Sequence, residues 1–276
     1  MNDQKNIYRP IACVVENFIQ ESPTICTVVL KPEEPFSFLA GQFASLSVPG
    51  VGEAPFTPSS SPYVKDRLEF TVMRAGRVTG LIHQLKKGDV VGVRGPYGKP
   101  YPLADYKGKD VILLGGGVGL APIRALFLSL RQTIDDYRSV LLCTGCRSPE
   151  DYIYKDQLFG PWLSLHEKIS CRIAADKAGP EWKHKVGVIT TLLADLPMEI
   201  NNSVAVVCGP PIMMKFGTLK LLELGFRDDQ IYLSMERKMY CAVGHCRHCL
   251  IGEIFVCKEG PVFRYDQLKG KPNIWV

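Results

Sequence analysis

The hydrophobic rhythm of the chain changes near residue 110, and this change constrains the fold more than any other feature. Before it, short β-branched segments broken by Gly and Pro predict a small antiparallel barrel. After it, apolar strand candidates alternate with helical stretches, which predicts a parallel sheet covered by helices on both faces. The predicted strands are residues 11–19, 24–32, 43–50, 67–74 and 89–98 in the first part and 111–117, 139–145, 168–174, 203–209 and 230–234 in the second.

The predicted helices and a cysteine-rich end complete the division of the chain. Helices are expected at residues 79–88, 120–132 and 210–225. Beyond residue 234 neither the strand pattern nor the helix pattern continues, and four cysteines lie in what remains. We therefore expect three domains, which are residues 1–105, 106–235 and 236–276.

Composition and charge argue against several classes of protein. The 276 residues are 46% apolar and 22% charged, which suits a globular chain. The net charge of +5 forms no basic stripe, so no nucleic-acid partner is expected. The apolar runs are too short to span a bilayer and the first ten residues lack a secretory signal, so we expect a cytoplasmic protein. Its ten cysteines are then not expected to form structural disulfides, and the clustered ones are expected to serve metal or redox chemistry.

Two turns mark the carboxyl edge of the predicted parallel sheet, where ligands of such sheets bind. The first turn contains four glycines between a strand and a helix, Gly115, Gly116, Gly117 and Gly119. Backbone N–H groups there can approach a pyrophosphate, although a simple tight turn would need the same glycines. The second turn follows a later strand and consists of Cys208, Gly209 and Pro210. Cys208 is either a cofactor contact or a small buried side chain.

Four cysteines near the C-terminus have the spacing C-x4-C-x2-C-x7-C and are Cys241, Cys246, Cys249 and Cys257. The first three follow the loop pattern of plant-type 2Fe–2S proteins, and the small residues 242–244 allow backbone amides to face the sulfurs. Four thiolates also suit a structural zinc ion, but zinc ribbons pair two C-x2-C motifs and this segment has one. His245 and His248 are alternative ligands or solvated loop residues. The spacing favours the 2Fe–2S cluster.

The order of these motifs resembles the ferredoxin–NADP reductase superfamily over nearly the whole chain. "GGGVGLAP" and "CGPP" after a β-rich part carry the resemblance, and "ERKMYCAVGHCRHC" with "VCKEGPVF" resembles the iron–sulfur branch. That branch contains the electron-transfer subunit of dihydroorotate dehydrogenase, the corresponding subunit of anaerobic sulfite reductase and the gamma subunit of cytosolic nickel–iron (sulf)hydrogenases. The resemblance implies an FAD-binding barrel in 1–105, an NAD(P)-binding α/β domain in 106–235 and a 2Fe–2S tail in 236–276. It also makes the four C-terminal cysteines the cluster ligands.

The resemblance further implies which residues contact the flavin and the nicotinamide. The segment "GEAPFTPSSSP" is similar to the one that runs along the flavin. Phe56 is expected to pack beside the isoalloxazine or the ribityl chain, Thr57 to lie near the flavin N5 edge, and Ser59 to lie further along. Thr57 and Cys208 are the expected catalytic-site residues. The glycines of both turns and Pro210 are expected to contact the dinucleotide.

Position 54 departs from the superfamily pattern. Relatives usually have an arginine there, two residues before the flavin-packing position, which contacts the flavin pyrophosphate, and this chain has Ala54 preceded by Glu53. The segment "RAGRVTG" offers a charge from Arg74 or Arg77, or backbone donors around Gly76, Val78 and Thr79. The alternative for this segment is an ordinary glycine turn with solvated arginines.

These features together predict an electron-transfer subunit. Hydride from NAD(P)H would reduce FAD between the barrel and the parallel sheet, and electrons would continue one at a time to the 2Fe–2S cluster. The expected partners are the catalytic and iron–sulfur subunits of a hydrogenase, a sulfite reductase or a similar complex, docked at apolar surface around residues 241–246. The alternatives are a stand-alone flavin reductase for ferredoxin or a small acceptor, and a nucleotide-binding module with a structural zinc tail.

The choice between NADH and NADPH rests on two short segments. An acidic residue near the ribose suits NADH, and a basic one suits the 2′-phosphate of NADPH. Candidates of both signs follow the second and third strands of the predicted sheet and are Arg147, Glu150, Asp151, Asp176 and Lys177. They slightly favour NADH.

Overall fold

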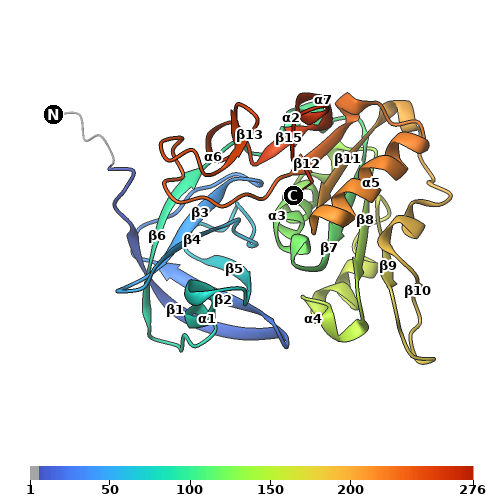
Figure 1. The fold of residues 1–276 in the computed structure, drawn as a ribbon. Helices are drawn as coiled ribbons and strands as arrows, with labels where there is room; N and C mark the ends of the chain where they lie inside the picture. The colour runs from blue at the N-terminus through green and yellow to red at the C-terminus, as the bar shows by residue number, and fades with distance from the viewer. Residues whose placement is uncertain (1–5, 276) are drawn as a thin grey trace.

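Two large sheets, one antiparallel and one mostly parallel, lie side by side in the computed structural model, which describes residues 6–275 (Figure 1). The strands are β1 (Ile11–Ser22), β2 (Ile25–Pro32), β3 (Phe43–Val48), β4 (Gly52–Phe56), β5 (Leu68–Met73), β6 (Val90–Tyr97), β7 (Asp110–Gly116), β8 (Ser139–Cys146), β9 (Ile169–Ala175), β10 (Lys185–Val186), β11 (Ser203–Cys208), β12 (Ile231–Ser234), β13 (Leu250–Ile251), β14 (Ile254–Phe255) and β15 (Val262–Arg264). The α-helices are α1 (Arg77–Ile82), α2 (Leu103–Tyr106), α3 (Leu120–Gln132), α4 (Lys155–Leu158), α5 (Pro211–Glu223), α6 (Val256–Glu259) and α7 (Tyr265–Leu268).

The first sheet has the strand order β4-β3-β6-β1-β2-β5, and every neighbouring pair is antiparallel. Its interior is apolar, with Val28, Leu46 and Phe70 fully buried. The five strands predicted for this part of the chain are confirmed. The sequence does not predict β4, because Gly52 and Pro55 are poor strand formers. As an edge strand, β4 tolerates the missing N–H group of Pro55.

Helix α1 begins earlier and ends earlier than the predicted helix at 79–88. The hydroxyl oxygen of Thr79 accepts hydrogen bonds from the backbone N–H groups of Ala75 (2.9 Å) and Gly76 (2.8 Å). These bonds satisfy donors at the start of the helix, so the first turn forms before Thr79 rather than at it.

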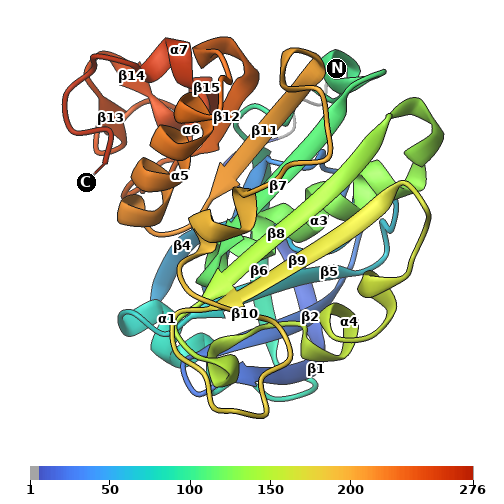
Figure 2. The ribbon, with the colours of Figure 1, turned by 90° about the vertical axis from the view of Figure 1, so that its right-hand side faces the viewer.

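The second sheet has the order β10-β9-β8-β7-β11-β12-β15, and its pairs are parallel up to β12. Alternate residues of β7 face opposite cores: Val111 and Leu113 pack with α3, whereas Ile112 and Leu114 pack on the side of α5. Figure 2 shows β9, β8, β7 and β11 running side by side. The predicted doubly wound α/β fold after an antiparallel barrel is confirmed.

The C-terminal segment returns to the second sheet instead of remaining apart from it. β15 pairs antiparallel with β12 as the last strand, and its residue Phe263 is buried in the same core as β7. The sequence does not predict this strand, because three residues are too few to show an alternating pattern. The segment also touches the barrel, through a bridge between Lys99 and Pro261.

The helices in residues 6–275 are all too short or too polar to cross a bilayer. The longest, α3 and α5, have 13 residues each, whereas a spanning helix needs about 20.

Candidate functional site

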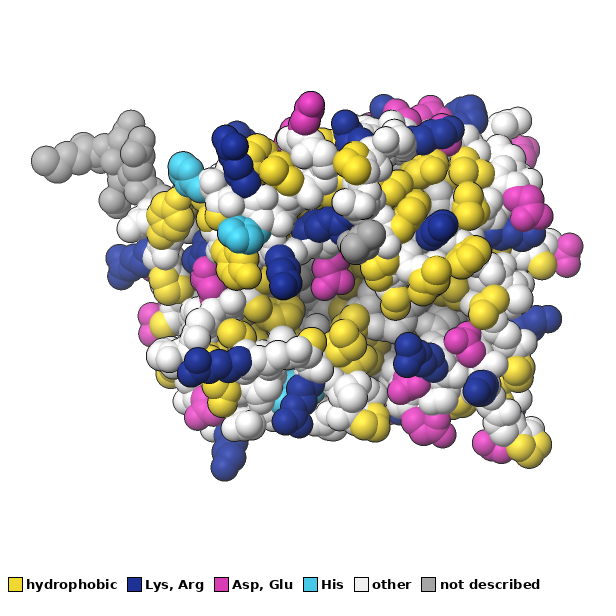
Figure 3. Space-filling model, in the orientation of Figure 1, with side chains coloured by type: hydrophobic (Ala, Val, Ile, Leu, Met, Phe, Trp, Pro, Cys, Tyr) yellow, Lys and Arg dark blue, Asp and Glu magenta, His cyan; other side chains and the backbone are white. Residues whose placement is uncertain are grey.

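A cleft of about 1150 Å³ lies between the barrel and the carboxyl edge of the parallel sheet. Strands β4 and β5, the two turns of the sheet, and residues 235–237 and 239 contribute to its lining. This volume exceeds the roughly 300–1,000 Å³ of a pocket for one drug-sized ligand, so the cleft has room for more than one such group. Figure 3 shows hydrophobic side chains around the hollow between the two sheets and over α5. The exposed side chains of Ile212, Phe216 and Leu219 on α5 form part of this apolar lining.

The barrel contributes Phe56 and Thr57 to the cleft, at the end of β4. Ser59, which was expected further along the flavin, lies elsewhere: it is fully buried and is not part of the cleft lining. Its hydroxyl hydrogen-bonds to the carbonyl oxygen of Glu69 (3.1 Å) and to the hydroxyl of Thr71 (3.1 Å). Ser59 therefore links the segment after β4 to strand β5.

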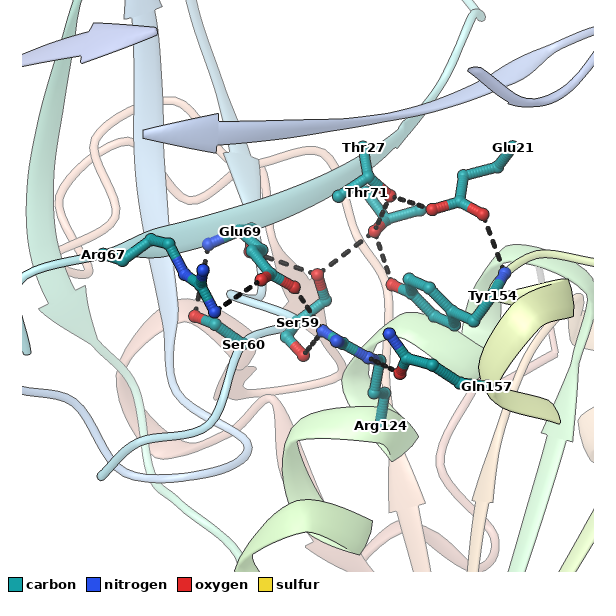
Figure 4. Close-up of polar contacts among 10 residues, drawn as sticks. All are labelled: Glu21, Thr27, Ser59, Ser60, Arg67, Glu69, Thr71, Arg124, Tyr154 and Gln157. Atoms are coloured by element: carbon teal, nitrogen blue, oxygen red, sulfur yellow. Dashed lines mark hydrogen bonds and ion pairs between the residues drawn. The ribbon is translucent and has the colours of Figure 1, made fainter. Parts of the chain in front are cut away.

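Ser59 belongs to a polar network between the two sheets (Figure 4). Arg124 on α3 forms an ion pair with Glu69 of β5 and donates to the carbonyl oxygen of Ser59 (2.8 Å). Tyr154 hydrogen-bonds to Thr71 through its hydroxyl group, and its ring lies 4.6 Å from the Arg124 guanidinium. Because Thr71 also lines the cleft, this network fixes the distance between the cleft walls.

The segment from Arg74 to Thr79 follows Met73, which lines the cleft at the end of β5. Arg74, Gly76 and Arg77 are exposed, and Val78 is half-buried. None of the residues 74–79 is part of the cleft lining, and the N–H group of Gly76 bonds to the Thr79 hydroxyl.

The glycine turn lies on the other wall of the cleft, between β7 and α3. Gly117 has a φ of +54°, in the left-handed region that favours glycine. At Gly119 an added Cβ would lie 2.5 Å from the carbonyl oxygen of Cys208 and 2.5 Å from the Cα atom of Gly209. Gly119 is therefore required for the close approach of the two predicted turns, and Gly115 is buried behind them.

The second turn closes the same wall, with Cys208, Gly209 and Pro210 all in the cleft lining. Cys208 is buried at the end of β11, and this burial raises the pKa of its thiol to about 12. The side chain is consequently a neutral thiol at ordinary pH, able to contact a ligand but not to act as a thiolate.

The far end of the cleft contains three of the five charged residues considered for the ribose. Arg147, Asp151 and Asp176 line it. The carboxylate of Asp151 already accepts hydrogen bonds from the backbone N–H (3.2 Å) and the hydroxyl (2.9 Å) of Ser148. Glu150 and Lys177 are not in the lining.

The cysteine loop leaves the cleft after Met239, the last residue of the lining before Cys241. Two of its sulfurs accept backbone hydrogen bonds. Cys241 Sγ accepts from the N–H groups of His245 (3.2 Å) and Cys246 (3.4 Å), and Cys257 Sγ accepts from Gly244 (3.2 Å). Gly244 thus donates as expected, whereas the other donors are His245 and Cys246 rather than the residues at 242 and 243.

The four thiols differ in environment. Cys249 and Cys257 are buried, and burial, followed by the hydrogen bond with Cys249, raises the pKa of Cys257 to about 12. Hydrogen bonds from the backbone of His248 and Cys241 lower the pKa of Cys246 to about 7. Within the described part of the chain, no three His, Cys, Asp or Glu side chains are arranged around one point as the ligands of a single ion would be.

The surface beside this loop differs from the expected apolar patch over residues 241–246. Ala242 is buried, and the exposed apolar side chain is instead Tyr240 (56% exposed), whose ring packs edge-on against His248. The positive φ of Ala242, +64°, turns the backbone at this position and directs the short side chain inward.

Sequence reasoning missed two buried arginines at the borders of the site, Arg94 on β6 and Arg124 on α3. Fully buried arginine is rare unless it is paired, so a lone arginine within the apolar run "VVGVRGPY" is the signal that could have identified Arg94. Its partner is Glu53, the residue that precedes the anomalous Ala54.

Comparisons with known families cover most of the chain. Residues 13–101 match the oxidoreductase FAD-binding domain and residues 113–218 match the oxidoreductase NAD-binding domain. Residues 236–269 match the iron–sulfur cluster binding domain of dihydroorotate dehydrogenase B.

Two curated relatives match over nearly their full length. The gamma subunit of sulfhydrogenase 2 from Pyrococcus furiosus is 36% identical over 249 residues, which cover 84% of this chain and 85% of that protein. A probable electron-transfer subunit of dihydroorotate dehydrogenase B (NAD(+)) from Methanocaldococcus jannaschii is 35% identical over 266 residues, 95% of this chain and 92% of that protein. The chain belongs to the iron–sulfur branch of the ferredoxin–NADP reductase superfamily.

Solved structures agree with membership of this superfamily. The Amycolatopsis cytochrome P450 reductase GcoB superposes with a TM-score of 0.72 at 25% identity, over 82% of this chain and 69% of that one. An NADH-dependent reduced ferredoxin–NADP oxidoreductase, studied for flavin-based electron bifurcation, superposes with a TM-score of 0.71 at 22% identity, over 93% and 91% of the two chains. This second superposition shows that the two chains share a fold.

As a member of this branch, the chain is an NAD(P)H-dependent oxidoreductase subunit with FAD-binding, NAD-binding and iron–sulfur domains. It is an electron-transfer subunit that works between NAD(P)H and a partner. The cleft has room for more than one ligand group, and the cysteine loop provides sulfur donors and amide hydrogen bonds of the kind that iron–sulfur centres use.

Proposed function

We propose that this subunit accepts electrons from NADH at FAD in the cleft and delivers them, through a 2Fe–2S cluster on Cys241, Cys246, Cys249 and Cys257, to a partner redox subunit. The observation that carries the proposal is that one wall of the cleft continues directly into the cysteine loop. Met239 lines the cleft, and Cys241 follows two residues later. FAD, when bound, converts the electron pair of a hydride into single electrons that an iron–sulfur centre can accept.

The donor set supports a 2Fe–2S cluster over zinc. Such a cluster takes two thiolates on each of two irons, and its potential depends on hydrogen bonds to sulfur. The amide bonds to Cys241 and Cys257 are of this kind. Zinc ribbons pair two C-x2-C motifs, whereas residues 241–257 contain one such motif within the C-x4-C-x2-C pattern typical of plant-type 2Fe–2S loops.

The cleft residues divide between the two dinucleotides. On the barrel side, Phe56 would pack against the flavin and Thr57 would lie at its N5 edge. Arg74, exposed next to the lining residue Met73, would supply the positive charge for the flavin pyrophosphate. On the sheet side, the glycines from 115 to 119 would approach the nicotinamide dinucleotide pyrophosphate. Cys208, with Gly209 and Pro210, would position the nicotinamide. The neutral thiol of Cys208 suits a contact that requires no proton transfer.

We assign NADH as the preferred donor on the charges that line the far end of the cleft. Asp176 and Asp151 both line it, and the Ser148 hydrogen bonds occupy only Oδ2 of Asp151, so either carboxylate can accept a hydrogen bond from a ribose 2′-hydroxyl group. Arg147 lies in the same lining and is the residue that would bind the 2′-phosphate group of NADPH.

The partner is proposed to be the catalytic and iron–sulfur subunits of a cytoplasmic, hydrogenase-type complex. Two sulfhydrogenase gamma subunits from Pyrococcus furiosus are 36% and 34% identical to this chain. The exposed ring of Tyr240, next to the first cluster cysteine, is apolar surface that such a complex would cover.

Anaerobic purification followed by iron and acid-labile sulfide analysis tests the cluster. A titration with NADH and with NADPH, followed by visible absorbance, tests the flavin and the preferred nicotinamide donor. We expect flavin and 2Fe–2S absorbance, bleaching by NADH at lower concentration than by NADPH, and uptake of one more electron than the flavin alone accepts. Protein that contains zinc but no iron would contradict the assignment of a 2Fe–2S cluster. Native-host purification that yields the chain without stoichiometric partners would favour a stand-alone flavin reductase.

A further inference from the structure

Arg94 connects the barrel to the cysteine loop. Its guanidinium on β6 is 5% exposed and forms a two-pronged ion pair with Glu53 of β4, with Nε at 2.6 Å from one carboxylate oxygen and Nη2 bonded to the other. The same group donates to two backbone carbonyl oxygens of the loop, from Nη2 to Tyr240 (3.0 Å) and from Nη1 to Cys241 (3.2 Å).

These contacts join the two places where the proposed cofactors would lie. Glu53 is three residues before Phe56 on the strand that lines the cleft, and Cys241 is the first cysteine of the loop. A second bond from Nη1 to the hydroxyl of Tyr97 (2.9 Å) and the Tyr97 ring 5.2 Å away hold the guanidinium in place. One side chain therefore fixes the backbone of Cys241 against the flavin-side strand.

We propose that Arg94 is a positioning residue for electron transfer, which anchors the iron–sulfur loop and, with Glu53, sets the electrostatic field at the cluster. The inference rests on the proposed function, because it assumes a cluster on the four cysteines. Reduction adds one negative charge to a cluster, so a nearby fixed positive charge favours the reduced form and raises the reduction potential. A nearby negative charge lowers the potential for the same reason.

The pair therefore predicts shifts of opposite sign when each partner is neutralised. Arg94→Gln removes the positive charge and leaves Glu53, so the cluster potential shifts downward. Glu53→Gln leaves Arg94 unneutralised, so the potential shifts upward, by less, because the Glu53 side chain is 33% exposed and more strongly screened. The double variant lies between the two. Arg94→Lys keeps the charge and stays near the wild-type potential.

The experiment is an EPR-monitored redox titration of the cluster in the full-length holoprotein. Arg124→Gln is the matched control, because Arg124 is also buried and ion-paired, but its hydrogen bonds go to Ser59, Glu69 and Gln157. We expect this control to lower the unfolding temperature without moving the cluster potential. A general loosening of the protein would instead move the potential in the control and in both Arg94 and Glu53 variants alike.

The inference would be overturned if the cluster potential shifts with the same sign in Arg94→Gln and Glu53→Gln, or shifts in neither. In that case the cluster signal of the wild-type protein would still support the proposed function. A wild-type protein without iron would overturn the proposed function, and the inference with it. Where Arg94→Gln does not fold, an upward shift in Glu53→Gln together with an unchanged potential in Arg94→Lys supports the inference, and any other pair of results contradicts it.

Discussion

At the scale of single residues, the burial of Cys208 limits the chemistry of its thiol. A thiol in water has a pKa of about 8.5, and burial raises that of Cys208 to about 12. The raised pKa means that the folded protein holds this proton at a pH where an exposed cysteine would lose it. The side chain thus remains neutral across the pH range in which the enzyme works, and its contribution is contact and shape.

We predict that the rate of flavin reduction by NADH, plotted against pH, shows no ionisation of Cys208 between about pH 6 and 9. Cys208→Ser should change the rate, because the side chain lines the cleft, but should leave the shape of the pH profile unchanged. Stopped-flow bleaching of the flavin at several pH values measures both. An inflection near the ordinary pKa of cysteine in the wild type that disappears in Cys208→Ser would contradict the assignment.

Gly119 is a second residue whose environment makes a sharp prediction. Gly119→Ala would place a Cβ against the backbone of Cys208 and Gly209, where no flexible side chain can move away, and should destabilise the fold by about 1–3 kcal/mol. Gly80→Ala is the control, because a Cβ there meets nothing within 4 Å and alanine favours a helix by up to about 1 kcal/mol. Thermal unfolding should separate the two variants in opposite directions. Equal stabilities would show that the two turns do not pack as described.

At the scale of elements, a polar network joins α3 and the segment before α4 to strand β5 (Figure 4). The ion pair between Arg124 and Glu69 is almost completely buried, whereas Tyr154 contributes a neutral hydroxyl to a group of buried hydroxyls. Removing one partner of a buried ion pair leaves an uncompensated charge, which costs much more than one neutral hydrogen bond. The two kinds of contact can therefore be told apart by mutation.

We predict that Arg124→Met lowers the free energy of unfolding by about 3–5 kcal/mol and that Tyr154→Phe lowers it by about 1 kcal/mol. Urea denaturation followed by flavin fluorescence and by far-UV circular dichroism measures both effects. Arg67, which also lies 3.5 Å from Glu69, could rescue part of the first loss. The double variant Arg67→Gln with Arg124→Met removes that partner, and its stability should fall further.

The elements that the sequence predicts are those whose pattern is complete within one segment. The strand and helix around the glycine turn are apolar over several residues, and their bounds are close to the predicted ones. β4 and β15 lacked such a pattern, because one contains Gly52 and Pro55 and the other has three residues. Arg94 and Arg124 were missed for a different reason. Their ion-pair partners, Glu53 and Glu69, lie 41 and 55 residues away along the chain, so no local spacing reveals the pairs.

At the scale of the whole molecule, the cysteine-rich segment is built into the other two parts. Arg94 of the barrel holds its first turn, β15 extends the parallel sheet, and α7 contributes the buried Leu268 to the core shared with β7. This arrangement places the loop at the junction of barrel and sheet, where Figure 1 shows it. A loop held on both sides keeps a fixed position relative to the cleft, which an electron path between two centres requires.

The cleft and the cysteine loop are nevertheless separable in chemical terms. Phe56, Thr57, Gly117 and Cys208 line the cleft, whereas the four loop cysteines do not.

Replacing Cys241 and Cys246 with serine should therefore abolish the iron–sulfur signal and keep the flavin, because the substituted side chains are only partly buried and nearly isosteric. NADH should still bleach the flavin and support reduction of ferricyanide, while transfer to the partner subunit is lost. Cys171→Ser, a cysteine outside the loop, should change neither activity. If the cluster-free variant reduces the partner at the wild-type rate, electrons leave from the flavin itself and the loop has another purpose.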